Sequence, residues 1–198
     1  MGAREIRQVG IDEFVAGVEA LENFSPDKVW EYVRSRAIQP HTLEPYIFFS
    51  PAKYTRNLIF KNDLFEVLAF CWGIGQSSTI HNHHNQRGWV MVSTGKLKVQ
   101  NYRILERNPQ AHTCKLEPTE SCLLTAGSLA KVEIEENVHQ VLNLGEWNER
   151  AVSVHIYSKP YNTCEVYQLD RGTYCDMKLY YTSLYGKLRE VEVATAQS

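Results

Sequence analysis

Two segments near the start of the chain have apolar side chains at helical spacing. Within residues 11–21 the apolar positions recur every three or four residues, which predicts an amphipathic helix. A second helix is predicted after Ser25, because Pro26 suits the first helical position and Asp27 places an acid in the first turn. Ser25 is the expected N-cap, and Pro40 is expected to end this helix.

After about Arg56 the pattern changes to short runs that alternate apolar and polar residues or are continuously apolar. Closely spaced runs of this kind predict the strands of a β-sandwich or barrel. We therefore expect a mainly β fold, a β-barrel with N-terminal helices. The expected organisation is a helical segment at 1–50 packed on the barrel, a barrel domain at 51–188 and a tail at 189–198. The predicted strands are 65–72, 89–92, 97–104, 122–125, 130–135, 139–143 and 152–157.

The composition argues against several classes of partner. The chain has 21 basic and 23 acidic residues, a net charge of −2 and no basic stripe, so we expect no nucleic acid and no membrane surface as partner. Its most apolar run, residues 65–72, is too short to span a bilayer, and the N-terminus lacks an apolar signal core. Five cysteines without a CxxC pair argue against a zinc ribbon and favour a reducing cytoplasm.

Three histidines stand where a β-barrel can bring them to one metal ion. Side chains at i and i+2 of a strand point to the same face, so His81 and His83 can both face inward. His139 can meet them from a distant strand, whereas His84 is expected to point to the opposite face. Converging neutral imidazoles favour a mid-row transition metal over calcium or magnesium.

The spacing around these histidines resembles the two motifs of the cupin superfamily, which implies a cupin-type, jelly-roll-like β-barrel. The first motif has a glycine, five residues, His-x-His, usually a glutamate and a final glycine, and the second ends in His-x-x-x-Asn. A glycine replaces the glutamate here, so the site would offer three neutral ligands and keep open positions for a substrate. The matching residues are Gly75, His81, His83, Gly88 and Gly95 in the first motif, and His139 and Asn143 in the second.

Within that superfamily the chain resembles the cysteine dioxygenase family of thiol dioxygenases, from about residue 54 to residue 186. The matching segments are Tyr54-Thr55-Arg56, Trp72-Gly73, Ile80-His81-Asn82-His83, Ser153-Val154-His155-Ile156-Tyr157-Ser158 and Asn162-Thr163-Cys164. The resemblance implies Fe(II) held by three histidines, a hydrogen-bonded relay beside it and a clamp for the substrate carboxylate. The corresponding residues are His81, His83 and His139 for iron, Ser153, His155 and Tyr157 for the relay, and Arg56 and Tyr54 for the clamp.

The resemblance also implies an enzyme, a cysteine dioxygenase-type oxidoreductase that converts L-cysteine and O2 to cysteine sulfinate in cysteine catabolism. A thiol and an amine two carbons apart can chelate the metal, and three histidine ligands then leave one position for O2. Both oxygen atoms transfer to sulfur without an external reductant, because the substrate supplies all the electrons. The expected partners are a small thiol and O2, and the expected state is a cytoplasmic monomer or weak homo-oligomer.

The sequence departs from the family at two places. Mammalian members have a cysteine at the position of Gly88, which crosslinks to the tyrosine matching Tyr157, so this chain follows the bacterial type without that bond. The family also often has a cis peptide bond before a proline at the position of Lys159. A cis bond before lysine costs about 3 kcal/mol more than trans, so the shape of this segment and the choice of thiol are open.

Three alternatives are open. A dioxygenase for another small acidic thiol, such as 3-mercaptopropionate, keeps the mechanism, but related enzymes for that substrate commonly lack an arginine at the position of Arg56. A non-catalytic cupin that senses a small ligand would bind without consuming O2, and it gives no reason for the relay. A cupin isomerase using zinc or manganese would not require a redox metal.

Overall fold

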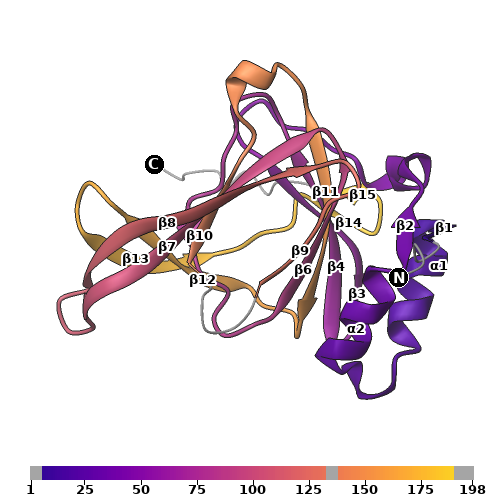
Figure 1. The fold of residues 1–198 in the computed structure, drawn as a ribbon, viewed down its shortest axis with the longest axis horizontal. Helices are drawn as coiled ribbons and strands as arrows, with labels where there is room; N and C mark the ends of the chain where they lie inside the picture. The colour runs from indigo at the N-terminus through magenta and orange to yellow at the C-terminus, as the bar shows by residue number, and fades with distance from the viewer. Residues whose placement is uncertain (1–5, 133–137, 190–198) are drawn as a thin grey trace, which may run out of the picture.

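The protein is described by a computed structural model that covers residues 6–132 and 138–189. Two β-sheets face each other, and a helical layer covers the outside of one of them (Figure 1). The seven-stranded sheet contains, in spatial order, β15 (Lys187–Leu188), β14 (Ser183–Leu184), β3 (Thr55–Lys61), β4 (Phe65–Trp72), β11 (Ala151–Ser158), β6 (Gly88–Thr94) and β9 (Leu129–Val132). Six further strands form a closed circuit, β10 (His139–Leu142), β5 (Ile80–His81), β12 (Thr163–Gln168), β13 (Thr173–Lys178), β8 (Thr113–Thr125) and β7 (Lys96–Asn108).

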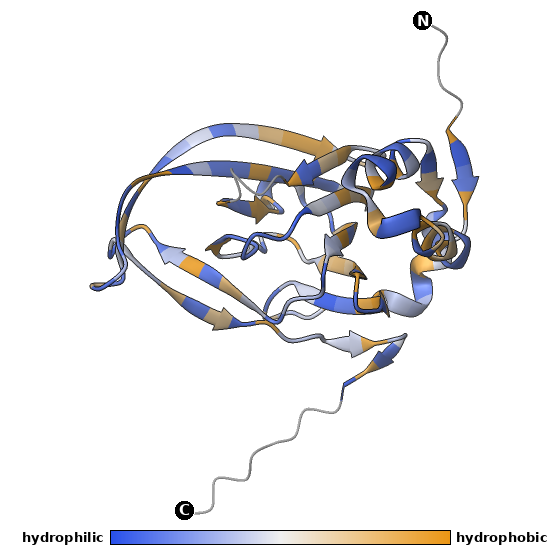
Figure 2. Ribbon diagram, turned by 90° about the horizontal axis from the view of Figure 1, so that it is seen from below, coloured by the Kyte–Doolittle hydropathy of each residue, from blue (hydrophilic) through white to orange (hydrophobic). Residues whose placement is uncertain are grey.

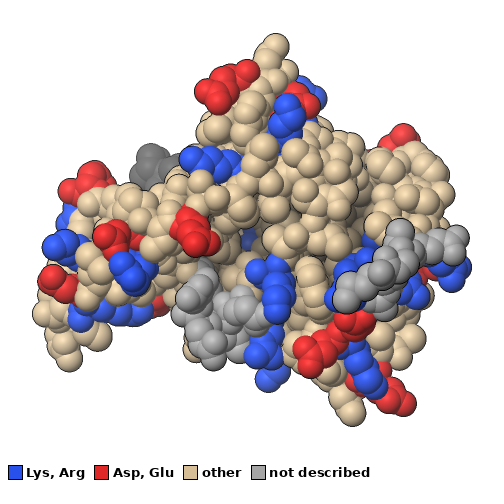
Figure 3. Space-filling view, in the orientation of Figure 1, with Lys and Arg blue, Asp and Glu red and all other residues tan. Residues whose placement is uncertain are grey.

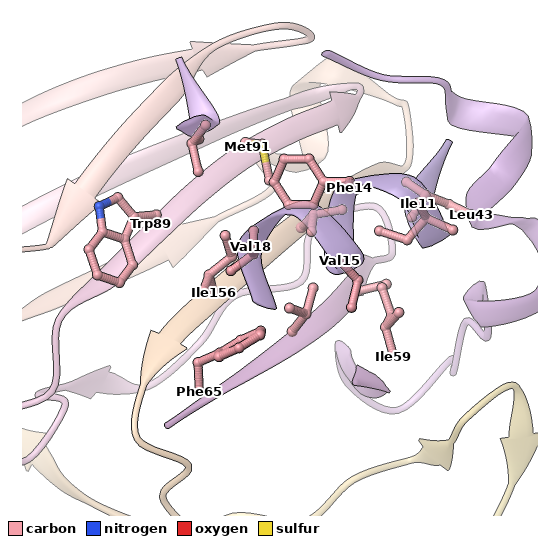
Figure 4. Packing of buried hydrophobic residues seen from close by; sticks show 14 of the residues in the cluster. Ile11, Phe14, Val15, Val18, Leu43, Ile59, Phe65, Trp89, Met91 and Ile156 are labelled. Atoms are coloured by element: carbon pink, nitrogen blue, oxygen red, sulfur yellow. The ribbon is translucent and has the colours of Figure 1, made fainter. Parts of the chain in front are cut away.

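The N-terminal region packs on the outer face of the seven-stranded sheet. It contains α1 (Ile11–Glu19) and α2 (Pro26–Val33), with a small parallel pair made of β1 (Arg7–Val9) and β2 (Arg36–Ile38). Phe14 and Val18 of α1 are fully buried in one cluster with Phe65 and Ile156 of the sheet (Figure 4). Each such side chain contributes about 1.5–3 kcal/mol when it leaves water. The mainly β barrel with N-terminal helices predicted from the sequence is therefore confirmed.

The two central strands of this sheet, β4 and β11, are buried along almost their whole length. Successive side chains of a strand alternate between its faces. On β4, residues 65, 67, 69 and 71 contact the helical layer, whereas 68, 70 and 72 face the other sheet. Burial on both faces explains why the segment 65–72 has almost no polar residue. On β11 the same alternation turns His155 and Tyr157 inward.

The second helix begins where its sequence signals predict, but it ends at Val33, and β2 lies between this end and Pro40, so the prediction that Pro40 ends the helix is wrong. Ser25 is the N-cap residue of α2 and Pro26 occupies the first turn, as predicted. The Ser25 side chain, however, makes no capping hydrogen bond to any part of the chain that the structure describes. Pro40 opens a 3₁₀ segment, Pro40–Tyr46, and further 3₁₀ turns lie at Glu22–Phe24 and Gly145–Trp147.

Several strands were not predicted from the sequence. β12 and β13 form an antiparallel pair in which much of β13 is half-buried or exposed, so their apolar pattern is weak. β7 and β8 are 13 residues each and form a long hairpin that extends away from the helices (Figures 1 and 2). Its outer part is largely exposed, so the prediction ended the first of these strands at residue 104 and began the second only at residue 122. The end of the strand predicted at 130–135 and nearly all of the predicted tail lie outside the described residues.

The segment after the relay strand resolves the question about Lys159. No peptide bond among the described residues is cis, so the bond before Lys159 is trans. Lys159 instead adopts a left-handed conformation, with φ of 59°, and its N–H donates to the carbonyl of Leu64 at 2.6 Å. A left-handed turn at Lys159 therefore stands where family members often have a cis peptide bond.

The surface agrees with the near-neutral charge of the chain. Basic and acidic side chains are interspersed over the face shown in Figure 3. Within the described ranges, neither α-helix is long and apolar enough to cross a membrane.

Two glycines with positive φ provide a matched test of the barrel. A Cβ at Gly95 (φ +74°) would lie 2.4 Å from the carbonyl oxygen of Arg150 and 2.8 Å from Cα of Ala151, whereas a Cβ at Gly127 (φ +85°) meets nothing within 4 Å. We expect Gly127→Ala to cost about 1 kcal/mol of unfolding free energy from backbone strain alone. Gly95→Ala should cost about 3 kcal/mol or more, because backbone must also move. Urea denaturation measures both, and equal losses would contradict the clash at Gly95.

Candidate metal centre

Three imidazole side chains converge between the two sheets. His81 and His139 lie directly opposite each other in the antiparallel pair of β5 and β10. His83 follows two residues after His81, and the three ring centroids lie 4.8–5.1 Å apart. One nitrogen from each ring can be chosen so that all three lie within 4.8 Å of one another. A single cation can therefore contact all three rings.

The backbone reaches this arrangement differently from the prediction. β5 ends at His81, so His83 lies beyond the strand and not at its next inward position. Two left-handed residues, His84 (φ 46°) and Asn85 (φ 61°), turn the chain immediately afterwards. His84 points away from the other histidines, as predicted, and its Nε2 lies 3.4 Å from Asp176.

The histidine cluster has the properties that a metal ligand set requires. His83 is 1% exposed, and neither of its ring nitrogens has a hydrogen-bond partner among the described residues. Leaving such atoms unpaired in the interior is costly, and a bound cation would satisfy one of them. Nδ1 of His81 lies 2.9 Å from the carbonyl oxygen of Thr79, so this nitrogen donates and Nε2 keeps its lone pair for a metal.

Burial keeps these imidazoles in the neutral form that binds metals. It lowers the pKa of His81 to about 4. Burial, together with the neighbouring histidines, also holds the pKa of His83 and of His139 well below the ordinary value. Metal binding then requires no proton release from these rings near neutral pH. The donor set therefore fits a transition metal such as iron.

A second group of possible ligands has a different explanation. His84, Glu165 and Asp176 have donor atoms close together near the surface. Glu165, however, already accepts hydrogen bonds from Arg107 and Tyr167. Asp176 is 74% exposed. This group is a solvated ion-pair network.

The three predicted relay residues form a chain of hydrogen bonds on the inward face of β11. The Ser153 hydroxyl lies 2.8 Å from Nε2 of His155, and Nδ1 of His155 lies 2.9 Å from the Tyr157 hydroxyl. The indole N–H of Trp72 donates to the Ser153 hydroxyl at 3.0 Å. Trp72 is therefore part of this chain, although the sequence analysis did not place it in the relay.

The partner of Trp72 determines the direction of the hydrogen bonds. The Ser153 oxygen accepts the indole proton of Trp72. Among the described residues, His155 is the acceptor available to the Ser153 hydroxyl proton. Nε2 of His155 then accepts, so Nδ1 carries the proton and donates to Tyr157. Burial lowers the pKa of His155 to about 3, so the ring stays neutral. The Tyr157 hydroxyl proton is then left to point into the cavity.

Arg56 and Tyr54 both line the cavity into which Tyr157 points. Arg56 is 7% exposed, and its Nε and Nη2 lack hydrogen-bond partners within the described part of the chain. Burial alone would lower its pKa, but Tyr161, Tyr157 and other nearby groups raise it, so the guanidinium stays charged. Tyr54 stacks on Trp72 with ring centroids 4.6 Å apart and forms part of the wall.

One cavity of about 210 Å³ connects these groups. It lies between the two sheets, and Arg56, the three clustered histidines and Tyr157 all line it. Tyr54 and His155 line it as well, whereas Ser153 lies behind His155. The structure thus brings together all eight residues that the sequence singled out.

Sequence reasoning missed three polar residues around this cavity. Tyr161 packs edge-on against Tyr157, with centroids 5.1 Å apart, but its loop position gave no signal. Glu66 and Tyr181 meet beside Arg56. Glu66 did carry a signal, because it is the one charged residue in the apolar run 65–72.

Asn143 of the second histidine motif has a structural role. Its side-chain amide donates to the carbonyls of Trp72, Gly73 and Glu149 at 3.2, 3.0 and 2.8 Å. These bonds join the end of β10 to the end of β4, one from each sheet. They fix the end of β10, which carries His139, against the end of β4, which pairs with the relay strand β11.

A cupin-type barrel with a three-histidine cluster and a buried arginine defines the class of this protein, and comparison with known proteins gives the family. The family model for cysteine dioxygenase type I matches residues 8–170. The chain belongs to the cysteine dioxygenase type I family, a family of oxidoreductases. The enzyme class and the cupin-type fold predicted from the sequence are confirmed.

Individual relatives are similar at modest identity. Cysteine dioxygenase type 1 of Danio rerio is 26% identical over 177 residues, which cover 89% of this chain and 86% of the relative. Cysteine dioxygenase type 1 of Homo sapiens is 27% identical over 180 residues, covering 90% and 80%. Among solved structures, a conserved protein with a double-stranded β-helix domain from Klebsiella pneumoniae aligns with a TM-score of 0.47 and 14% identity, over 69% of this chain and 94% of that one.

Proposed function

We propose that this protein is an Fe(II)-dependent thiol dioxygenase that oxidises L-cysteine with O2 to cysteine sulfinate. One observation carries the proposal: three neutral histidines, without a carboxylate among them, share a cavity with a buried guanidinium whose hydrogen-bonding fork is unpaired. Bound ferrous iron would supply coordination positions at which the thiol and O2 are brought together. The proposed ligands are His81, His83 and His139.

Arg56 is the proposed site for the substrate carboxylate. Its planar fork can donate two parallel hydrogen bonds to one carboxylate, and its burial strengthens them. Because Nε and Nη2 lack protein partners within the described ranges, the incoming carboxylate would satisfy both. Held there, the substrate presents its thiol to the histidine cluster in a fixed orientation.

Tyr157 is the proposed hydrogen-bond donor to the reacting groups. The chain from Trp72 through Ser153 and His155 leaves its hydroxyl proton directed toward the cavity. Burial raises the pKa of Tyr157, so the phenol keeps this proton. Its proposed role is to donate a hydrogen bond to the oxygen atoms on sulfur and so stabilise their negative charge as the sulfinate forms.

A reducing compartment suits this proposal. All five cysteines lie among the described residues and all are free, and Cys164 lines the cavity. A thiol substrate also stays available only where disulfides do not accumulate. We therefore propose the cytoplasm as the site of action.

Oxygen consumption tests the proposed function. Protein loaded with ferrous iron under nitrogen is mixed with O2 and L-cysteine, 3-mercaptopropionate or cysteamine, and sulfinate is identified by mass spectrometry. We expect uptake with L-cysteine, one O2 per sulfinate. Uptake with 3-mercaptopropionate and none with cysteine would change the substrate, and no uptake with any thiol would favour a ligand sensor or a zinc or manganese isomerase.

Gly88 is expected to be required for the position of Tyr157. The two residues are paired across β6 and β11, and a Cβ at Gly88 would lie 3.0 Å from Cε1 of Tyr157. Gly88→Ala should displace the tyrosine ring by a few tenths of an ångström and lower kcat by roughly threefold to tenfold. Gly127→Ala, where the added methyl meets open space, is the control. Unchanged kcat in Gly88→Ala would mean that the Tyr157 ring position is not critical.

A further inference from the structure

Glu66 is a buried acid that has no part in the proposed metal binding, carboxylate binding or hydrogen-bond donation to the substrate. It stands on β4, and its side chain has 0% exposure. Because side chains alternate along a strand, it shares the inward face of β4 with Leu68 and Phe70. Phe70 lines the cavity, whereas Glu66 is not among the lining residues and lies behind the wall.

Two side chains contact the Glu66 carboxylate, one at each oxygen, and a backbone hydrogen bond at Tyr161 adds to them. The Tyr181 hydroxyl donates a short hydrogen bond to Oε2. Oε1 lies 3.7 Å from Nη2 of Arg56. The other nearby cation is Lys61, which is exposed and whose Nζ lies 3.4 Å from the Tyr181 hydroxyl. Tyr181 and Arg56 thus hold the carboxylate between them.

The geometry of the ion pair leaves Arg56 available to a ligand. A distance of 3.7 Å is longer than a hydrogen bond, and neither Nε nor Nη2 of Arg56 has a hydrogen-bond partner in the described part of the chain. Glu66 therefore attracts the guanidinium without occupying its fork. Removing a carboxylate from water is costly, so a buried acid at this place needs a compensating role.

We propose that Glu66 is a positioning residue for substrate binding: with Tyr181, it holds the Arg56 guanidinium in the orientation that binds a carboxylate from the cavity. The inference deepens the proposed function and rests on it, because it assigns the substrate class at the Arg56 end. That class is a small thiol that carries a carboxylate. A thiol without a carboxylate does not use Arg56, so it is indifferent to Glu66.

Glu66→Gln is the variant that isolates this role. The amide keeps the shape and an oxygen acceptor for Tyr181, but it removes the charge that attracts Arg56. We expect the apparent KM for L-cysteine to rise about tenfold and kcat to stay within about threefold, because an interaction with the substrate in both ground and transition states is weakened. Tyr181→Phe, which removes the hydrogen bond to Oε2, should show the same pattern to a smaller extent.

Two comparisons separate positioning from a general structural effect. Cysteamine has the thiol and amine of cysteine without the carboxylate, so its anaerobic binding to iron-loaded protein should be the same in wild type and Glu66→Gln. L-cysteine binding, measured by the same titration, should weaken about tenfold. Lys61→Met removes the nearby exposed charge and should leave the binding of both thiols unchanged.

The possible outcomes decide the inference. Weaker binding of L-cysteine by Glu66→Gln, with unchanged binding of cysteamine, supports it. Equal weakening of both thiols, or no change in either, would overturn it. If Glu66→Gln does not fold, Tyr181→Phe decides by the same comparison.

The titration also keeps the inference separate from the proposed function. Wild type that consumes no O2 with any thiol refutes the dioxygenase activity, while the anaerobic titration still reports whether Glu66 controls carboxylate binding. If wild type oxidises L-cysteine, and Glu66→Gln oxidises it at the same rate and binds it with the same affinity, only the role of Glu66 is refuted.

Discussion

Replacing His83 with alanine is expected to abolish tight iron binding and thiol-dependent oxygen consumption, whereas replacing the adjacent His84 changes neither by more than about twofold. His83 is buried with both ring nitrogens unpaired by the described residues, and its ring lies within about 5 Å of the other two. A metal held by three protein ligands loses a third of its protein donors in the variant. His84 faces Asp176 at the surface and contributes no donor to the cluster.

The measurement is the iron content of purified protein after anaerobic loading and desalting, together with oxygen uptake. His84→Ala is a close control, because it alters the neighbouring residue of the same turn. Full iron occupancy in His83→Ala, or loss of iron in His84→Ala, would show that the wrong histidine has been assigned. Unfolding midpoints of the metal-free proteins exclude a trivial loss of structure.

Arg56→Ala is expected to lower kcat/KM for L-cysteine about a hundredfold, mainly through a higher apparent KM. The substrate carboxylate loses both hydrogen bonds of the guanidinium fork. The variant also leaves the buried Glu66 without its cation, so some loss of stability is expected as well. Arg56→Lys keeps the charge but not the fork, and it should recover only part of the affinity.

Steady-state kinetics with L-cysteine and cysteamine measure this effect. The cysteamine reaction provides the reference, since that thiol has no carboxylate to lose. An unchanged KM for L-cysteine in Arg56→Ala would disprove the carboxylate clamp. A full recovery in Arg56→Lys would mean that charge alone, without the bidentate geometry, is sufficient.

Local patterns in the sequence were enough for the architecture and for most of the site. Helical spacing at 11–21 and alternation in segments such as 152–157 depend only on neighbouring residues, and both predicted elements are present as α1 and β11. The histidine spacing and the alternate positions of Ser153, His155 and Tyr157 have the same local origin. The strands β12 and β13 escaped prediction because tertiary pairing, rather than an apolar pattern, stabilises them.

The sequence by itself determined which residues are available for the proposed metal, relay and carboxylate sites, because spacing and side-chain alternation within a segment depend only on neighbouring residues. Only the tertiary structure decided how those residues are paired. The turn after β5 places His83 beyond the strand, and Trp72 sets the direction of the relay from the neighbouring strand β4. Glu66 and Tyr181, 115 positions apart, meet beside Arg56. Such contacts depend on which distant strands pair and on how the two sheets pack, and the pattern within one segment does not encode either.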